Sequence, residues 1–347
     1  MRKLILFTIL LGMMLIPVSA TEFSPPPAPD SAQIYMPKND ETFAQGVWHI
    51  IKTALVAVRP NLADGCRVSL SVITAVFLMG ILGSLSENTS ATMRLIGAVM
   101  IGILLLEPIQ SMIQLGTDTV RNLSEYGKLL LPVMTAAVAA QGGGTTSAAI
   151  YTGTVFFDAL LTTAITKLAV PALYIYLCLC VANCALQQDM LSRVRNSVKW
   201  MMTWCLKWTL YIFTGYISIT GVISGTVDSS ALKAAKLTIS GVVPVVGGIL
   251  SDASETILVS AGVMKSAAGV YGILAVLAIC AGPFVKIGVQ YLLLKLSAAV
   301  CNMFGYKPAV SLVQDFSTGM GFALAMVGSV CILLLVSLVC FMKGMSG

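Results

Sequence analysis

Long apolar runs separated by short polar stretches dominate the chain from residue 68 onward. The runs lie at 68–85, 95–115, 129–144, 148–168, 168–188, 208–227, 237–250, 266–285, 287–300 and 316–342. A helix needs about 20 apolar residues to cross the hydrocarbon core of a bilayer, so this pattern predicts a series of membrane-spanning helices. The shorter runs can be counted in more than one way, which gives roughly seven to ten spans.

The composition supports the same fold class. Hydrophobic residues make up 57% of the 347 residues and charged residues only 10%, whereas a soluble domain typically carries about 25% charged residues. One soluble core could not bury this much apolar surface. We therefore expect an all-α, polytopic helical membrane protein, and we disfavour an apolar globular enzyme.

The first residues have the three-part pattern of a secretory signal peptide. Arg2 and Lys3 precede a short apolar run, and Val18-Ser19-Ala20 places small residues at a cleavage site. We predict a signal peptide over 1–20, with an uncleaved first helix as the alternative. The Pro-rich segment 21–42 is then expected to be an extended, mobile linker outside the cytoplasm.

Residues 41–60 have apolar positions at helical spacing along one face, with a polar side that includes His49 and Lys52. Such a helix either lies in the membrane interface or packs on the protein itself, and the pattern does not decide between them. We assign 43–122 to this amphipathic helix and the first membrane helices, and 123–347 to the main membrane domain.

One charged segment indicates the orientation. Residues 189–207 contain four basic residues and one acid, and basic residues near span ends are retained in the cytoplasm. We therefore predict a cytoplasmic loop here. Trp200, Trp204 and Trp208 follow one another at the start of the next span, as in an interfacial aromatic belt.

A weak internal repeat has an offset of 112 residues, which separates "LLPV" (130–133) from "VVPV" (242–245) and also Pro171 from Pro283. The two candidate repeats cover about 123–227 and 235–343, although chance similarity is an equal alternative. Each half contains a short broken segment, and broken helices at a repeat interface line the central sites of many transporters. The first includes Gly142, Gly143 and Gly144.

The second broken segment, "ISGVVPVVGGILSDASET" (239–256), contains most of the apolar run 237–250, which is short for a span. Pro244 removes a backbone donor, and Gly247 and Gly248 weaken the helix at the same point. Asp252 and Glu255 then resemble the capped start of a new helix. The segment is either a tight turn or a re-entrant, pore-lining element.

Ionisable residues inside the predicted spans are the other candidates, because burying a charge in lipid is costly. They are Asp158, Lys167, Lys286 and Lys295. Each could snorkel to the interface, form a structural ion pair, or contribute a polar lining to a conduit.

Motifs for catalysis are not found in the sequence. His49 is the only histidine, no phosphate-binding Gly motif occurs, and the nine cysteines are scattered through apolar segments. We expect no enzyme activity and assign no catalytic, cofactor-binding or metal-binding residues; no cofactor and no nucleic-acid partner are expected.

Four segments resemble the stage III sporulation protein AE family of endospore-forming bacteria. They are "GGGTTSAA" (142–149), "VVPVVGGILSDASETI" (242–257), "LAICAGPFVKI" (277–287) and "LLLKLSAAV" (292–300). The resemblance implies a multi-pass protein of the mother-cell membrane facing the forespore. It further implies partners encoded in the same stage III operon and, indirectly, stage II sporulation protein Q. Together these proteins would form a transenvelope channel, also called a feeding tube, that acts after engulfment.

Two classes of function therefore remain. The first is a subunit of this channel complex in the lipid bilayer, and the second is a stand-alone secondary transporter or permease for a small solute. The broken helices suit both classes, while the resemblance and the exported N-terminus favour the first.

Overall fold

The computed structural model describes residues 25–37, 42–85, 90–140, 144–219, 267–304 and 307–344. Helices account for nearly all of these residues, and no strand occurs among them. The elements are α2 (Asp30–Gln33), α3 (Phe43–Leu85), α4 (Ser90–Ala140), α5 (Gly144–Ala164), the π-helical turn η1 (Ile165–Ala169), α6 (Val170–Leu186), α7 (Asp189–Ile219), α10 (Ala267–Cys301), the 3₁₀ turn η2 (Asn302–Phe304) and α11 (Lys307–Gly344).

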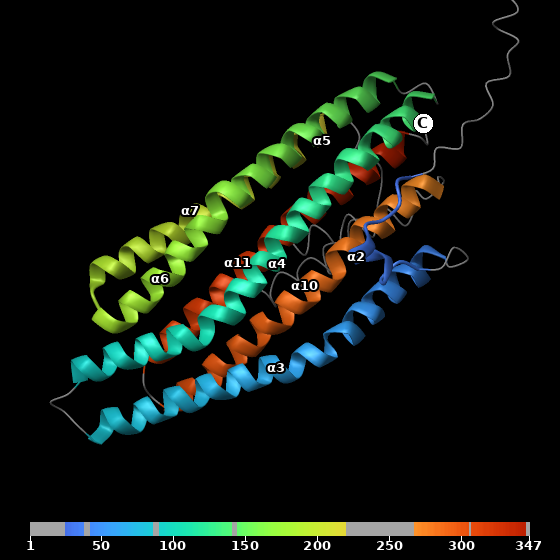
Figure 1. Ribbon diagram of the computed structural model, residues 1–347. Coiled ribbons are helices and arrows are strands. Elements are labelled where there is room, and N and C mark those ends of the chain that lie inside the picture. The colour runs from blue at the N-terminus through green and yellow to red at the C-terminus, as the bar shows by residue number, and fades with distance from the viewer. Residues whose placement is uncertain are drawn as a thin grey trace, which may run out of the picture.

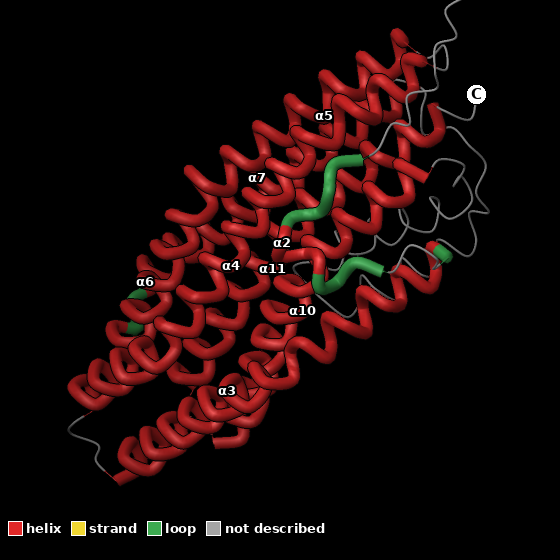
Figure 2. The backbone as a smooth tube through the Cα atoms, turned by 45° about the vertical axis from the view of Figure 1, so that its right-hand side comes forward, coloured by secondary structure: helices red, strands yellow, loops and turns green. Residues whose placement is uncertain are grey.

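The long helices lie side by side in one elongated bundle (Figures 1 and 2). Five helical segments in the described part of the chain are long and apolar enough to cross a membrane. They are Leu62–Ile81, Leu95–Ala139, Ser147–Leu186, Gly269–Cys301 and Lys307–Met342. The predicted fold class, a helical membrane protein, is confirmed.

Several predicted spans merge into continuous helices. The runs 95–115 and 129–144 both belong to α4, whose 51 residues extend for about 75 Å at 1.5 Å per residue. The runs 148–168 and 168–188 follow one another through η1, and 266–285 and 287–300 both lie in α10. The predicted boundary between residues 122 and 123 falls inside α4.

Interior prolines do not end these helices. Pro108 and Pro132 lie within α4, Pro60 within α3 and Pro283 within α10. A proline removes a single backbone donor, and neighbouring helices can satisfy the freed carbonyl, so helices in membranes tolerate it. Residues 41–60 and 68–85 are consequently not separate elements, since α3 runs through both.

Helix α11 forms the centre of the bundle. It contacts α4, α5, α6, α7 and α10, and nearly all of its residues from Ala309 to Met342 are buried. Small residues allow this close packing: a Cβ atom at Gly319 would lie 3.0 Å from Cδ2 of Leu177 on α6. Association through small residues is typical of helices in membranes.

The amphipathic face of α3 packs on the protein. Ile50, Ala54 and Val58 are buried, and α3 packs chiefly against α10. Trp48 and Leu55 are exposed on the other side of the helix. The observed contacts agree with the second of the two alternatives for this segment.

Residues 25–37 differ from the predicted mobile linker, because they pack on the bundle beside α10. The Ala28 amide donates a hydrogen bond to the Tyr271 hydroxyl at 3.3 Å, and the Tyr126 hydroxyl donates to the Pro26 carbonyl at 3.4 Å. Ala28 and Ala32 are buried. Proline favours extended structure but does not prevent packing, and small alanines fit against the helix surface.

The predicted cytoplasmic loop 189–207 is helical. The chain reverses at Gln187, which has a left-handed φ of 51°, and Asp189 then begins α7. A left-handed residue is a common C-terminal cap of a helix. A second hairpin joins α10 to α11, so Pro171 and Pro283 both lie in the outgoing helix of a hairpin. The internal repeat itself stays a prediction.

Polar contacts inside the bundle form a candidate functional site

The predicted site residues are not brought together in one place. Asp158 lies in α5, and Lys286 lies in α10 and is half-buried. Gly144 is the first residue of α5. The remaining candidates lie outside the described residues; they are Gly142, Gly143, Pro244, Gly247, Gly248, Asp252 and Glu255.

Asp158 is the most deeply buried carboxylate of the described chain, with an exposed fraction of 4%. The Ser124 hydroxyl on α4 donates a hydrogen bond of 2.6 Å to its Oδ2 atom. The Oδ1 atom is also buried and has no hydrogen-bond partner. Lys128 lies one turn beyond Ser124 and acts on Asp158 electrostatically, but its side chain is exposed.

Asp158 belongs to a row of polar side chains along α5. Thr154 precedes it by four residues and donates a hydrogen bond of 2.8 Å to Ser337 of α11. Thr162 follows it by four residues, and its hydroxyl oxygen is buried with no partner. Residues four apart share one helix face. We call Ser124, Thr154, Asp158, Thr162 and Ser337 the polar seam; it lies where α5 packs on α4 and α11.

The helix geometry changes directly after the polar seam. The π-helical turn η1 begins three residues beyond Thr162 and ends at Ala169. Short π-helical turns within α-helices are rare and occur frequently at functional sites. Lys167 lies in this turn and is exposed, so it belongs to the surface of the bundle.

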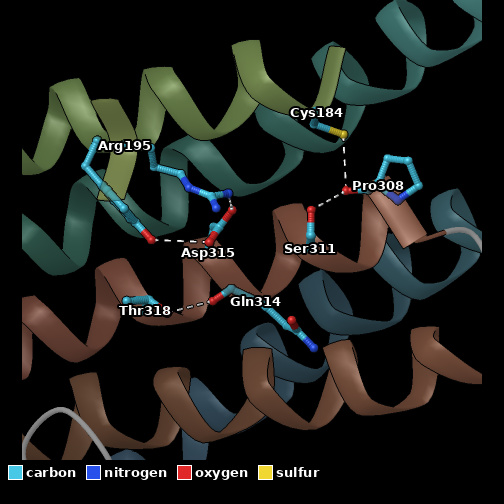
Figure 3. A network of polar contacts seen from close by, with 8 residues as sticks. Cys184, Arg195, Pro308, Ser311, Gln314, Asp315 and Thr318 are labelled. Atoms are coloured by element: carbon cyan, nitrogen blue, oxygen red, sulfur yellow. Dashed lines mark hydrogen bonds and ion pairs between the residues drawn. The ribbon is translucent and has the colours of Figure 1, made fainter. Parts of the chain in front are cut away.

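A second polar cluster joins α7 to α11 near the α6–α7 turn (Figure 3). Arg195 of α7 forms an ion pair with Asp315 of α11, and the two side chains have exposed fractions of 17% and 18%. The Tyr176 hydroxyl on α6 donates a hydrogen bond of 3.4 Å to Asp315 Oδ1. Nearby, the Cys184 thiol donates to the Pro308 carbonyl at 3.3 Å. Three helices therefore converge on Asp315.

Sequence reasoning missed Asp315 as a site residue. Its signal was present, because Asp315 is an acid at the very start of the most apolar run, 316–342. The cluster of basic residues around Arg195 predicts a solvated loop. In such a loop Arg195 is not expected to form an ion pair with a residue of another helix. The two residues are 120 positions apart, so only the helix packing brings them together.

The tryptophans of α7 form a ladder on its exposed face. The ring centroids of Trp200 and Trp204 are 6.2 Å apart, and those of Trp204 and Trp208 are 5.8 Å apart. All three side chains are about half exposed or more. The ladder follows the helix axis for about 12 Å, and the interfacial aromatic belt stays a prediction.

The chemistry available in the bundle is that of oxygen ligands. The described residues include no group of three or more His, Cys, Asp or Glu side chains that could hold a metal ion together. The polar seam instead offers one carboxylate and several hydroxyls in an apolar environment. These groups can bind a small cation or orient water.

The helices long enough to cross a membrane, packed around α11, define a polytopic helical membrane protein. The chain belongs to the stage III sporulation protein AE family, whose family model matches residues 35–344. The resemblance predicted from its motifs is confirmed, and the family supports a role in sporulation.

A similar curated protein is stage III sporulation protein AE of Bacillus subtilis (strain 168), with 23% identity over 236 residues. The aligned region covers 68% of this chain and 59% of that relative, so this chain spans less than two thirds of the relative's length. No solved structure matches the chain.

Proposed function

We propose that this protein is a membrane subunit of the channel complex between mother cell and forespore, and that it acts after engulfment. The observation that carries the proposal is the family match over residues 35–344. A bundle built around buried polar contacts supports a role beyond anchoring, because polar groups within membrane helices are costly and usually functional. We place the protein in the mother-cell membrane that faces the forespore.

The expected partners are the other subunits encoded in the stage III sporulation operon and, indirectly, stage II sporulation protein Q. The exposed Trp200–Trp208 ladder of α7 supports contact with lipid or with a neighbouring subunit. Aromatic side chains are enriched both at membrane interfaces and in protein interfaces. The surface opposite this ladder is fixed to α11 by the Arg195–Asp315 ion pair.

The proposed orientation places the α6–α7 and α10–α11 turns in the cytoplasm. The two turns lie at the same end of the bundle (Figure 1), and Arg193 and Lys307 lie in the first two turns of α7 and the first turn of α11. The start of α3 and the C-terminus lie at the opposite end (Figure 1), as an exported N-terminus after a cleaved signal peptide requires. A reporter active only outside the cytoplasm should be silent at Gln188 and active at the C-terminus; the reverse result would contradict this orientation.

The complex itself is tested in the spore-forming host. The gene is deleted and replaced by a tagged copy, and heat-resistant spores are counted. We expect the deletion to stop development after engulfment and the tagged protein to co-purify from sporulating membranes with other products of its operon. A normal spore yield in the deletion strain would contradict the proposal. So would a tagged protein that supports normal spore formation but co-purifies with none of the other operon products.

A stand-alone permease is the second candidate, and the buried carboxylate of Asp158 is the observation that favours it. Carboxylates near the middle of membrane helices often serve in solute and ion pathways. Purified protein in sealed vesicles would then take up a solute without any partner subunit. If the protein restores spore formation only when the other subunits are also present, the channel subunit is favoured instead.

A further inference from the structure

Asp158 lacks the partners that a buried carboxylate requires. Its exposed fraction is 4%, the Ser124 hydroxyl satisfies Oδ2, and Oδ1 has no hydrogen-bond partner. Buried polar groups are nearly always paired, and a charge in the membrane interior is especially costly without a partner. Lys128 acts on Asp158 from α4, but its side chain is exposed and no ion pair joins the two in the described part of the chain.

The hydroxyl of Thr162 is free on the same face of α5. Other threonines in these helices donate to the carbonyl four residues earlier, as Thr152 does to Ala148 at 2.8 Å and Thr135 does to Leu131 at 2.7 Å. The Thr162 oxygen is buried and makes no such bond. Because Thr162 lies one turn from Asp158, two buried oxygen atoms without partners belong to the same helix face, one turn apart.

The charge and type of these oxygens define the ligand. One carboxylate provides a single negative charge, which matches a monovalent cation. Carboxylate and hydroxyl oxygens are hard ligands suited to alkali and alkaline-earth ions rather than to soft metals. A calcium ion takes six to eight oxygen ligands, commonly with several carboxylates, and the described residues include no group of three or more His, Cys, Asp or Glu side chains that could hold it.

We propose that Asp158, Thr162 and Ser124 bind a single sodium ion between α4 and α5. The ion supplies the missing partner for Asp158 Oδ1 and for the Thr162 hydroxyl. The π-helical turn η1 begins three residues after Thr162. The regular α-helix is therefore interrupted next to the proposed site, as is common at functional sites. This inference goes beyond the proposed channel function and does not depend on it.

The test uses the purified full-length protein in detergent or lipid nanodiscs. Its unfolding temperature is measured in NaCl, KCl and choline chloride at equal ionic strength. A ligand that binds the folded state raises stability with its concentration, so NaCl should raise the unfolding temperature in a saturable way and choline chloride should not. Equal unfolding temperatures in all three salts, or a rise in KCl as large as that in NaCl, would overturn the proposal.

Two variants with matched controls locate the site. Asp158→Asn keeps the shape and removes the charge, and should abolish the sodium response. Thr162→Val removes one hydroxyl and should weaken sodium binding about tenfold, which corresponds to about 1.4 kcal/mol. Asp118→Asn and Thr152→Val are the controls, because Asp118 is an exposed acid on α4 and the Thr152 hydroxyl already bonds to its own helix.

The variants also separate a sodium site at Asp158 from an effect of sodium elsewhere on the protein. A sodium response that persists in Asp158→Asn would overturn the proposal, as would equal sodium affinity in Thr162→Val and Thr152→Val. If Asp158→Asn does not fold, the Thr162 pair alone decides. Direct binding of radioactive sodium to the wild-type protein is an independent test that does not involve spore formation, and an absence of saturable binding would overturn the proposal.

Discussion

Helices α7 and α11 differ sharply although both return along the bundle after a tight turn. Helix α11 is buried along nearly its whole length, including Ser329 and Ser337. Helix α7 exposes Trp200, Trp204 and Trp208 on one side and buries only its opposite face. The span with the highest mean hydropathy in the described chain is therefore also the most buried one.

The difference shows that apolar composition alone does not predict whether a membrane helix faces lipid or protein. Lipid and protein interior are equally apolar, so a hydrophobic run does not tell which of them surrounds a helix. Small residues are the better signal, because they let helices approach closely. Helix α11 contains Gly319, Gly321 and Gly328 in its middle part, whereas the exposed face of α7 carries bulky aromatic rings.

The largest expected effect comes from truncating one aromatic side chain in each helix. Phe322 of α11 is 1% exposed, and its ring centroid lies 6.2 Å from that of Tyr176. Phe322→Ala should lower the free energy of unfolding by about 3–5 kcal/mol, because it leaves a cavity. Trp204→Ala on α7 should change it by less than about 0.5 kcal/mol.

Unfolding of the purified variants in increasing SDS, followed by circular dichroism, measures both changes. Trp208→Ala is a further control on the exposed face. Equal losses in Phe322→Ala and Trp204→Ala would show that the ladder is buried against protein, and the contrast between the two helices would fail. A loss confined to Phe322→Ala supports it.

The helical membrane class could be predicted from the sequence, because long uncharged runs have few other solutions. Asp158 could also be singled out, since an acid inside an apolar run is costly wherever the helix packs. The continuity of α4 could not be foreseen. Pro108 and Pro132 are strong helix breakers in isolation, and only contacts with neighbouring helices decide whether they end a helix in a membrane.

The partners of the polar residues were not predictable either. Ser124 and Asp158 are 34 positions apart, and Arg195 and Asp315 are 120 apart. Each residue shows a local signal, but the pairing depends on how α4, α5, α7 and α11 cross. Arg195 carried a misleading signal as well, because a cluster of basic residues near a span end predicts a cytoplasmic loop, whereas these residues lie in helix α7.

A smaller effect is expected from the ion pair that holds the two helices together. Arg195 and Asp315 have exposed fractions of 17% and 18%, so water screens them only partly. Asp315→Ala leaves Arg195 without its partner and should lower the free energy of unfolding by about 1–3 kcal/mol. A double-mutant cycle with Arg195→Ala measures the coupling between the two residues.

One outcome of the double-mutant cycle would contradict the predicted coupling between Arg195 and Asp315. If the losses of Arg195→Ala and Asp315→Ala simply add in the double variant, the two residues do not interact. Lys207→Ala is the matched control, because Lys207 is an exposed basic residue farther along α7. Its effect should add to that of Asp315→Ala without any coupling.

The smallest effect should come from the hydroxyl of Tyr176, which adds α6 to the same junction. Its hydrogen bond to Asp315 is long, at 3.4 Å, whereas the Tyr216 hydroxyl donates to the Ala149 carbonyl at 2.9 Å near the other end of α7. Tyr176→Phe should therefore lower the free energy of unfolding by about 0.5 kcal/mol and Tyr216→Phe by about 1 kcal/mol. SDS unfolding again gives the measurement. Since the Tyr176 hydroxyl acts through Asp315, its effect should vanish in the Asp315→Ala background, while that of Tyr216→Phe should remain. A larger loss in Tyr176→Phe than in Tyr216→Phe would mean that α6, rather than α7 alone, sets the position of Asp315 against the buried helix α11.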